Sequence, residues 1–344
     1  MIFFRTDGNE KIGLGHVMRC LSIAEVCKSK EIEIRFVLSD TKCQEIIENK
    51  GFECSVLGTC YNDMESELNS FCELIAHFKP QTIVIDSYYV TYNYLYTIRE
   101  KANTVYIDDV LAFAYPVDVL INYNIFSSLE DYLELYKSSE CFPKFLLGTK
   151  YVPLRSEFSN CVYKEPSKKV KKILVSTGGS DPEHVGINLL KYIGDNLNLL
   201  STFNFIFVIG SVNKDVSRIK ELANNIPNVH IIVDAKNMQE IMNSCDLAVS
   251  AAGSTLYELC VTCVPTITYV LADNQLPAAK AFSEQGLMEF IGDIRSIKNY
   301  CELILKAIFD LSNDSFKRKS MCKKSYTQIN KIGAKTISNS ICYF

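Results

Sequence analysis

The chain opens with residues 2–20, IFFRTDGNEKIGLGHVMRC, in which a short apolar run leads into a glycine-bearing loop and then an amphipathic segment. The apolar run at residues 2–5 predicts a strand, and the spacing of Val17, Leu21 and Ala24 predicts a helix over residues 15–29. A further apolar run at residues 33–38 predicts a second strand. Strand, helix and strand in this order form the unit from which parallel α/β sheets are built.

The same alternation continues through the rest of the chain. Residues 82–86 are nearly all apolar, as a parallel strand buried on both faces should be. The other predicted strands are residues 54–57, 105–108, 119–122, 173–176, 205–209, 230–233, 247–250, 266–270 and 289–291. The other predicted helices are residues 43–50, 63–78, 183–196, 297–311 and 314–330, and further helical patterns lie between the successive predicted strands from residue 205 to residue 291. These repeated units predict two doubly wound, Rossmann-like α/β domains that face each other across a cleft.

A polar segment divides the two series of units. Residues 164–172, KEPSKKVKK, are basic and interrupted by proline, which indicates a linker whose charges are solvated. We therefore expect a first domain at residues 1–160, a linker at 161–169, a second domain at 170–330 and a C-terminal tail at 331–344. A length of 344 residues fits two domains of roughly 100–200 residues each.

Composition excludes several classes of protein. Hydrophobic residues make up 48% and charged residues 22%, as in globular proteins, and the net charge of -4 lacks the basic excess of a nucleic-acid-binding protein. No apolar run reaches the roughly 18 residues of a membrane span, and the first residues do not resemble a signal peptide. We therefore expect a cytoplasmic chain whose 14 cysteines are reduced. Cys260 and Cys263 form a single CxxC, which without a second pair or a nearby histidine favours structural thiols over zinc.

Chemistry-bearing residues lie just after predicted strands, where open α/β sheets bind ligands. His16 follows Gly13 and Gly15 at the first turn of a predicted helix. The positive end of the helix dipole disfavours an imidazolium there, and a neutral imidazole is what a general base needs. The alternative is a histidine that caps the helix or belongs to the core.

The loop after the strand at residues 173–176 reads STGGSDP over residues 176–182. Gly178 and Gly179, with nearby hydroxyls before a helix, could form an anion cradle from backbone N–H groups. The alternative is a capped turn, with Asp181 as N-cap and Pro182 at the first helical position. Both interpretations can hold at once.

A third loop, residues 250–258, leads from a strand into a helix. Gly253, Ser254 and Thr255 could bind a diphosphate at the helix start, and Glu258 one turn later could accept both hydroxyls of a ribose. The alternative is a capping box, because hydroxyl residues precede Glu258 at about cap spacing.

Two weaker candidates complete the set. Asn274 and Gln275 follow the strand at residues 266–270 and would place polar amides at the cleft, although an ordinary polar turn explains them equally well. Arg155, at the end of the first half, could clamp a phosphate or orient a sugar. A surface ion pair with Glu157 is the alternative.

Together these motifs resemble the UDP-2,4-diacetamido-2,4,6-trideoxy-β-L-altropyranose hydrolases of pseudaminic acid biosynthesis. The resemblance runs from Met1 to about Arg295 and rests on RxD at residues 5–7, GxGHxxRC at 13–20, VIDSY at 84–88, YIDD at 106–109, LGxxYxPLRxEF at 147–158, GGSD at 178–181, GST at 253–255 and NQ at 274–275. These enzymes are similar to the lipid II-forming glycosyltransferase MurG, which implies a two-domain GT-B fold. One departure is Ser87, where the family commonly has histidine, so no catalytic role is assigned to that position.

The resemblance implies that His16 is the catalytic base of a nucleotide-sugar hydrolase. It implies substrate contacts from Arg5, Asp7, Gly15, Arg19, Asp86, Tyr88, Arg155, Gly178, Gly179, Asp181, Gly253, Ser254, Thr255, Glu258, Asn274 and Gln275. Water would attack the anomeric carbon, the C–O bond to UDP would break, and the carbon would invert. The chain contains no Asp-x-Asp pair, so we expect neither a metal nor a cofactor.

Two other functions remain open from the sequence. A GT-B glycosyltransferase would use the same UDP-sugar donor with a hydroxyl acceptor in place of water, and the fold alone does not separate the two. A nucleotide-sugar-binding protein without catalysis is the third possibility, and His16 argues against it. In each case the expected partner is a small UDP-sugar bound by a monomer, with no nucleic acid and no membrane span.

Overall fold

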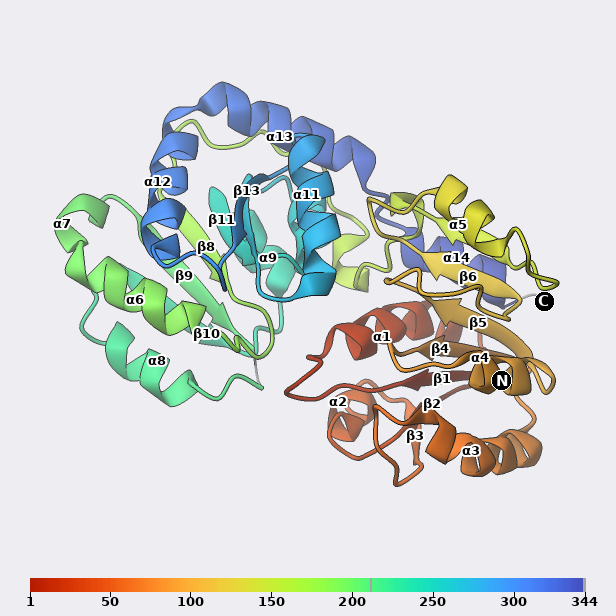
Figure 1. Ribbon diagram of the computed structural model, residues 1–344. Coiled ribbons are helices and arrows are strands. Elements are labelled where there is room, and N and C mark those ends of the chain that lie inside the picture. Colours follow the sequence, from red (N-terminus) through yellow and green to blue (C-terminus); the bar gives the residue numbers. More distant parts are fainter. Residues whose placement is uncertain (211, 343–344) are drawn as a thin grey trace. The chain divides into compact units, whose positions relative to one another are not determined.

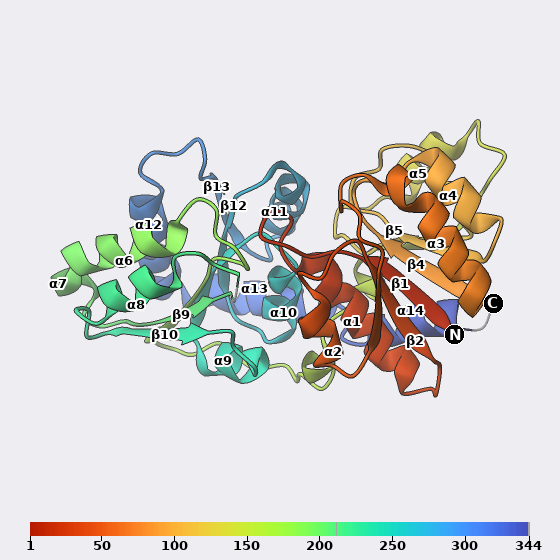
Figure 2. The same ribbon diagram turned by 90° about the horizontal axis from the view of Figure 1, so that it is seen from below.

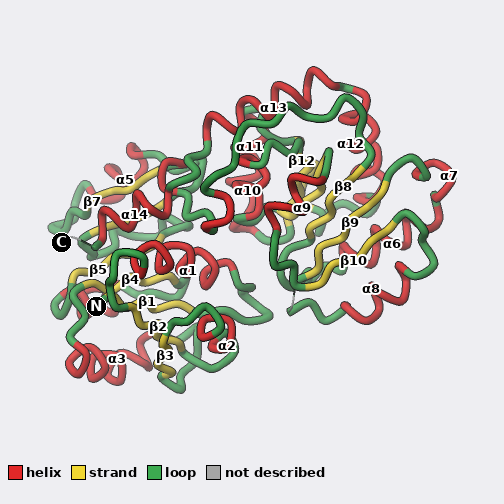
Figure 3. Tube along the Cα trace, turned by 180° about the vertical axis from the view of Figure 1, so that it is seen from behind, coloured by secondary structure: helices red, strands yellow, loops and turns green. Residues whose placement is uncertain are grey.

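The computed structural model describes residues 1–210 and 212–342 and divides the chain into two compact units (Figure 1). The first unit consists of Met1–Ser156 together with Ile332–Phe344, and the second consists of Glu157–Lys331. Each unit has its own parallel sheet, and the strands accordingly fall into two separate groups (Figure 3). The α/β class expected from the alternating pattern is therefore confirmed.

The first unit contains a seven-stranded sheet in the order β3-β2-β1-β4-β5-β6-β7, with every neighbouring pair parallel. The strands are β1 (Ile2–Thr6), β2 (Ile34–Leu38), β3 (Glu53–Val56), β4 (Thr82–Asp86), β5 (Asn103–Ile107), β6 (Val119–Asn122) and β7 (Lys144–Leu147). The strand order reverses between β1 and β4. The carboxyl ends of those two strands are the place where doubly wound sheets bind ligands.

Helices cover both faces of this sheet. Helices α1 (Gly15–Lys28), α2 (Gln44–Glu48) and α14 (Gly333–Ile341) lie on one face, and α3 (Met64–Phe78), α4 (Tyr92–Arg99) and α5 (Leu129–Tyr136) lie on the other (Figure 2). Asp63, Thr91 and Ser128 each accept a backbone N–H of the first turn of α3, α4 and α5. These caps explain where the three helices begin.

The second unit contains a six-stranded parallel sheet in the order β10-β9-β8-β11-β12-β13. The strands are β8 (Lys172–Ser176), β9 (Asn204–Ile209), β10 (Val229–Val233), β11 (Leu247–Ala251), β12 (Thr266–Val270) and β13 (Glu289–Asp293). Here the order reverses between β8 and β11. The two predicted glycine loops, after β8 and after β11, therefore flank the switch point of this sheet.

The helices of the second unit again form two layers. Helices α6 (Val185–Asp195), α8 (Val216–Ala223) and α12 (Tyr300–Asn313) lie on one face, while α9 (Met238–Ser244), α10 (Thr255–Val261) and α11 (Leu276–Glu284) lie on the other (Figure 2). Helix α13 (Ser315–Gln328) packs against α10, and the short α7 (Leu197–Leu200) follows α6. The main core forms where α6, α8 and α12 meet the sheet.

Every strand expected from the sequence is present, but several elements were not predicted. These are α4, α5, α7 and β7, together with the short 3-10 helices η1 (Thr149–Tyr151), η2 (Ser156–Phe158) and η3 (Asp273–Gln275). Helix α4 reads YNYLYTIR, whose aromatic and β-branched residues have low helix propensity. Burial of Tyr94, Leu95 and Ile98 against the sheet stabilises it instead.

The tail expected at residues 331–344 is wrong, because residues Gly333–Ile341 form α14. This helix belongs to the first unit and packs against α1. Its sequence, GAKTISNSI, is poor in strong helix formers, so its pattern resembled a polar tail. Ala334, Ile337 and Ile341 are buried, and tertiary packing overrides the weak propensity.

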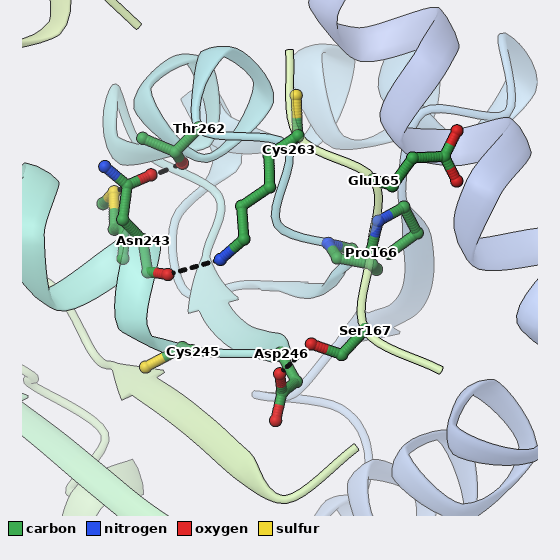
Figure 4. Close-up of a pocket in the computed structure, with 11 residues that line it drawn as sticks. Glu165, Pro166, Ser167, Asn243, Cys245, Asp246, Thr262 and Cys263 are labelled. Atoms are coloured by element: carbon green, nitrogen blue, oxygen red, sulfur yellow. Dashed lines mark hydrogen bonds between the residues drawn. The ribbon is translucent and has the colours of Figure 1, made fainter. Parts of the chain in front are cut away.

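The basic segment at residues 164–172 is bound to the second unit and is not a free connection. Asp246 accepts hydrogen bonds from Ser167 and from the backbone N–H groups of Lys171 and Lys172, the latter two at 2.8 and 2.9 Å. The ammonium of Lys164 donates to the carbonyl of Asn243 at 2.8 Å. Figure 4 shows the contact of Ser167 with Asp246 and that of Lys164 with Asn243, around a small pocket that Cys263 also lines.

Candidate active site

The candidate residues of the first unit centre on a histidine–carboxylate pair. His16 lies in the first turn of α1, and its Nδ1 is 2.6 Å from Oδ1 of Asp86, the last residue of β4. Thr6 of β1 pairs in register with Asp86, so the end of β4 lies beside the loop that leads from β1 into α1. The switch point of the sheet thus brings together two residues that are 70 positions apart.

Arg19, one turn further along α1, clamps the same carboxylate. Its Nε and Nη2 donate to the two oxygens of Asp86 at 2.6 and 2.5 Å, and its Nη1 donates to Asp109 at 2.7 Å and to Tyr123 at 2.9 Å. Burial alone would raise the pKa of Asp86, but the charge of Arg19 and the proximity of His16 hold it well below its usual range. Asp86 is therefore ionised at neutral pH.

This charge decides the tautomer of the imidazole. An ionised carboxylate only accepts hydrogen bonds, so the hydrogen between His16 and Asp86 resides on Nδ1. The lone pair of Nε2 is then available to take a proton. The ring of Tyr88 packs edge-on against His16 at a centroid distance of 4.5 Å and restricts its orientation. An imidazole held in this way can act as an oriented general base.

Arg5 and Asp7 hold together the segments that carry the His16 loop. The expectation that Arg5 contacts substrate is wrong. Arg5 is fully buried, and Glu67 binds its Nε and Nη2 at 2.6 Å each. Its Nη1 donates to Asp7 at 2.5 Å. The other oxygen of Asp7 accepts from the backbone and the hydroxyl of Ser39 at 2.8 Å. These bonds connect the ends of β1 and β2 with α3, so the pair positions the loop before α1.

Four residues of this network were absent from the predicted site. Asp109 accepts from Tyr88 at 3.1 Å and from Asn124 at 2.8 Å, in addition to Arg19. Asp109, Tyr123 and Asn124 all follow strand ends, so the rule that found Asp86 could have found them. Glu67 carried no such signal, because it lies inside α3 and reaches Arg5 only in the folded chain.

In the second unit, the loop after β8 adopts a conformation that requires glycine. Gly178 has φ of +86°, a value that side chains rarely adopt. The carboxylate of Asp181 accepts the backbone N–H groups of Val185 and Gly186 at 2.9 and 2.8 Å. Helix α6 begins at Val185 with His184 as its N-cap, so the expectation of Asp181 as N-cap and Pro182 at the first helical position is wrong. The buried Asp181 carboxylate is occupied by these two backbone bonds, so it shapes the loop.

Gly210, at the end of β9, lies directly against this loop. A Cβ atom at Gly210 would come within 2.3 Å of the carbonyl oxygen of Gly179 and 2.6 Å of its Cα. Such distances are not possible between real atoms, so only glycine permits the Gly178–Gly179 backbone to lie where it does. Gly210 is a structural determinant of the loop that sequence reasoning did not identify.

The loop after β11 holds the second glycine-bearing segment. Gly253 and Ser254 are exposed, Thr255 begins α10, and Glu258 is buried at 9% exposure. Within the described part of the chain, the Ser254 side chain accepts no hydrogen bond from the first turn of α10. Glu258 is also the fourth residue of the helix and not the third, so the capping-box alternative is not observed.

The remaining candidates occupy short irregular segments. Asn274 is exposed on η3, and Gln275 is half-buried, with its side-chain oxygen accepting the backbone N–H of Leu271 at 2.8 Å. Gln275 therefore braces the turn after β12, as the polar-turn alternative supposes. Arg155 is half-buried near the end of the first unit's main segment. Gly15 is exposed at the start of α1, beside His16.

Across residues 1–210 and 212–342, no group of three or more His, Cys, Asp or Glu side chains is arranged to hold a metal ion. Cys260 and Cys263 are both buried, and the Cys263 carbonyl accepts the Cys322 thiol at 3.0 Å. None of the helices described here has the length and apolar character needed to cross a membrane.

The two doubly wound sheets, with a glycine-bearing loop at the switch point of the second, agree with the family match. The chain belongs to the family described as glycosyltransferase family 28 C-terminal domain, whose model matches residues 158–337, more than half of the chain. Its fold is similar to that of Acinetobacter baumannii MurG, with a TM-score of 0.69 over 100% of this chain and 99% of the MurG chain, at 13% identity. The GT-B architecture implied by the resemblance is thereby confirmed.

Several curated proteins show similarity to the chain. An uncharacterised protein of Methanocaldococcus jannaschii, MJ1062, is 26% identical over 79% of the chain and 55% of its own length. A Helicobacter pylori protein named pseudaminic acid cytidylyltransferase and UDP-2,4-diacetamido-2,4,6-trideoxy-β-L-altropyranose hydrolase is 24% identical over 80% of the chain and 46% of its own length. The chain thus spans about half the length of these two relatives.

A third relative is closer to the chain in length. The Campylobacter jejuni UDP-2,4-diacetamido-2,4,6-trideoxy-β-L-altropyranose hydrolase is 21% identical over 75% of the chain and 86% of its own length. Two relatives therefore carry the name of the hydrolase family that the sequence motifs resemble, which confirms the resemblance.

Proposed function

We propose that this chain hydrolyses a UDP-linked diacetamido-trideoxyhexose to UDP and the free sugar in pseudaminic acid biosynthesis. The observation that carries the proposal is the buried pair of His16 and Asp86 at the switch point of the first sheet. A pure binding module has no need of an oriented base, whereas activation of a nucleophile requires one. The names of the relatives supply the substrate class.

In the proposed reaction, Nε2 of His16 removes a proton from a water molecule as its oxygen attacks the anomeric carbon. The bond between that carbon and the diphosphate oxygen breaks, and UDP leaves with the electron pair. Attack opposite the leaving group inverts the carbon. Asp86 stabilises the imidazolium that forms, and the fixed tautomer leaves Nε2 ready for the next cycle.

The second unit would hold the UDP moiety. The backbone N–H groups of the Gly178–Gly179 loop and of residues 253–255 would bind the diphosphate, and Glu258 would accept the ribose hydroxyls. Amides at these positions would also stabilise the charge that develops on the leaving group. Tyr88 and Asp109, the more accessible members of the first network, would contact the sugar.

A glycosyltransferase using the same donor is the second candidate, and the family 28 match favours it. The two differ only in the acceptor. The purified chain should therefore be incubated with a panel of UDP-sugars without any acceptor. Release of UDP and free sugar supports the hydrolase, turnover only after an acceptor is added supports the transferase, and binding without turnover removes both.

The bond that breaks can be tested with labelled water. When the reaction is run in H2-18O, the label should enter the sugar and not the UDP, because water attacks carbon. Label in the β-phosphate of UDP would mean attack at phosphorus and would contradict the proposed role of His16.

A further inference from the structure

Helices α1 and α14 bring two cysteines from opposite ends of the chain together. Cys27 lies in the last turn of α1, and Cys342 is the C-cap residue of α14. Their Sγ atoms are 3.4 Å apart, although 315 positions separate them in the sequence. Both residues belong to the first unit. A disulfide would require the sulfurs to approach by only about 1.4 Å more.

The surrounding contacts hold both sulfurs in place. The Ser338 hydroxyl lies 3.3 Å from each sulfur. The ammonium of Lys30, just beyond α1, donates to the Asn339 side chain at 2.8 Å. At the other end of α14, a Cβ atom on Gly333 would come within 2.1 Å of the Val152 carbonyl, so the helix backbone is seated closely there. The proximity of the thiols is thus built into the docking of α14.

The two thiols are chemically unequal. The contact with Cys342 and burial raise the pKa of Cys27, which therefore stays a thiol. Cys342 is half-buried, and its hydrogen bond with Cys27, together with Ser338 and Lys30, lowers its pKa below the usual value. A partly exposed thiolate reacts readily with peroxides, and a neighbouring thiol can then resolve the product.

We propose that Cys27 and Cys342 form an oxidisable dithiol site, which a peroxide converts to an intramolecular disulfide. The Cys342 thiolate attacks one peroxide oxygen, the O–O bond breaks, and sulfenic acid and hydroxide form; the hydroxide takes from solvent the proton that Cys342 released on ionisation, which gives the first water. The Cys27 sulfur then attacks the Cys342 sulfur, its proton passes to the departing hydroxide, and a second water leaves. Two thiols are oxidised to one disulfide, and one peroxide is reduced to two waters.

The disulfide would tie α14 covalently to α1, the helix that carries His16 and Arg19 at its other end. A cross-link over so long a segment restricts the unfolded chain, so it should raise thermal stability. The proposal does not depend on the enzymatic function assigned above.

Mass spectrometry of the full reduced chain provides the test. The protein is treated with a small excess of hydrogen peroxide, unfolded in urea with an alkylating reagent, and digested with trypsin without reduction. We expect residues 20–28, which contain Cys27, linked to residues 336–344, which contain Cys342. Fragmentation places the bond on Cys27 and not on Cys20, and reduction separates the peptides. The oxidised chain should also melt at least about 5 °C higher than the reduced chain.

Variants separate this site from general thiol oxidation. Cys342→Ser should abolish both the linked peptide and the melting shift, whereas Cys60→Ser, at an exposed cysteine, should preserve both. Cys27→Ser should have the same two effects as Cys342→Ser. If Cys27→Ser does not fold, the test relies on Cys342→Ser, because Cys342 is only half-buried. Two results would overturn the proposal. In one, Cys342 is oxidised to sulfinic or sulfonic acid while Cys27 remains a free thiol that the reagent alkylates; in the other, Cys342 forms a disulfide with another cysteine.

Discussion

The carboxylate of Asp86 lies 2.6 Å from Nδ1 of His16 and is held at the same time by two nitrogens of Arg19. One ionised side chain thus orients the proposed base and neutralises the neighbouring cation. The pair lies where β1 and β4 reverse the strand order, with Thr6 and Asp86 in register. Strand order therefore creates a relationship that no local sequence pattern contains.

The first prediction concerns His16. His16→Asn should lower kcat by about 10²–10⁴, the usual contribution of a general base, while UDP affinity stays near normal because the nucleotide is assigned to the second unit. Steady-state kinetics and calorimetry with UDP measure the two effects. His77→Asn, at an exposed histidine of α3, is the matched control. Near-normal turnover in His16→Asn would remove the residue from the mechanism.

The second prediction concerns Asp86 and activity. Asp86→Asn should lower kcat by about 10²–10⁴, because an amide no longer fixes the Nδ1–H tautomer or stabilises the imidazolium. The reaction rate at saturating substrate checks this directly. If kcat is unchanged, the carboxylate has only a structural role beside Arg19.

Asp86 should also contribute a pH-dependent part of the stability. Its folded-state pKa lies below the ordinary value of 3.8, so the unfolded chain takes up a proton first as the pH falls. Its contribution is full above about pH 5 and is lost as the pH falls towards the lowered pKa. Urea unfolding, followed by circular dichroism at pH 7 and pH 4, should show a smaller loss of stability in Asp86→Asn than in the parent. Asp131→Asn, at an exposed site in the same unit, should retain the parent's loss.

The third prediction concerns Glu258. Glu258→Ala should weaken UDP binding by about 1.5–3 kcal/mol, the usual worth of hydrogen bonds to a charged group. Glu221→Ala, at an exposed glutamate of α8, should leave binding unchanged. Unchanged UDP affinity in Glu258→Ala by calorimetry would remove the ribose assignment.

The fourth prediction concerns Gly210. Gly210→Ala must displace Gly179, because the new methyl group would meet its carbonyl oxygen at 2.3 Å. The dissociation constant for UDP should rise about tenfold or more, which corresponds to about 1.4 kcal/mol. In the control Gly194→Ala, the Cβ would meet Ile226 at 3.4 Å, close to ordinary contact, and binding should not change. If Gly210→Ala and Gly194→Ala bind UDP equally well, the loop tolerates the displacement of Gly179 and the prediction is wrong.

The fifth prediction concerns metal ions. Leaving-group stabilisation is assigned to backbone amides, so turnover should continue in excess EDTA.

Cys260→Ala and Cys263→Ala should each cost on the order of 1 kcal/mol of stability from lost packing, without loss of activity. One equivalent of zinc by metal analysis, together with inactivation by chelation, would contradict both expectations and make His184 and His230 the next residues to test.

The sequence alone determined the class of fold, every strand except β7, and the glycine-bearing loops proposed to bind the substrate. Periodicity located β1, β4 and β11, and the strand-end rule singled out His16, Gly178 and Gly253. These features depend on residues close together in the chain, which is why pattern and turn chemistry predict them. The resemblance to the UDP-sugar hydrolases rests on the same short motifs.

Only the tertiary structure decided which of these residues meet. It paired His16 with Asp86, buried Arg5 against Glu67, and placed Gly210 beneath Gly179. It also showed that the expected tail forms the helix α14, which places Cys342 next to Cys27. The physical reason is that strand order and helix docking are set by burial of surfaces from distant parts of the chain, and no local pattern records which surfaces will meet.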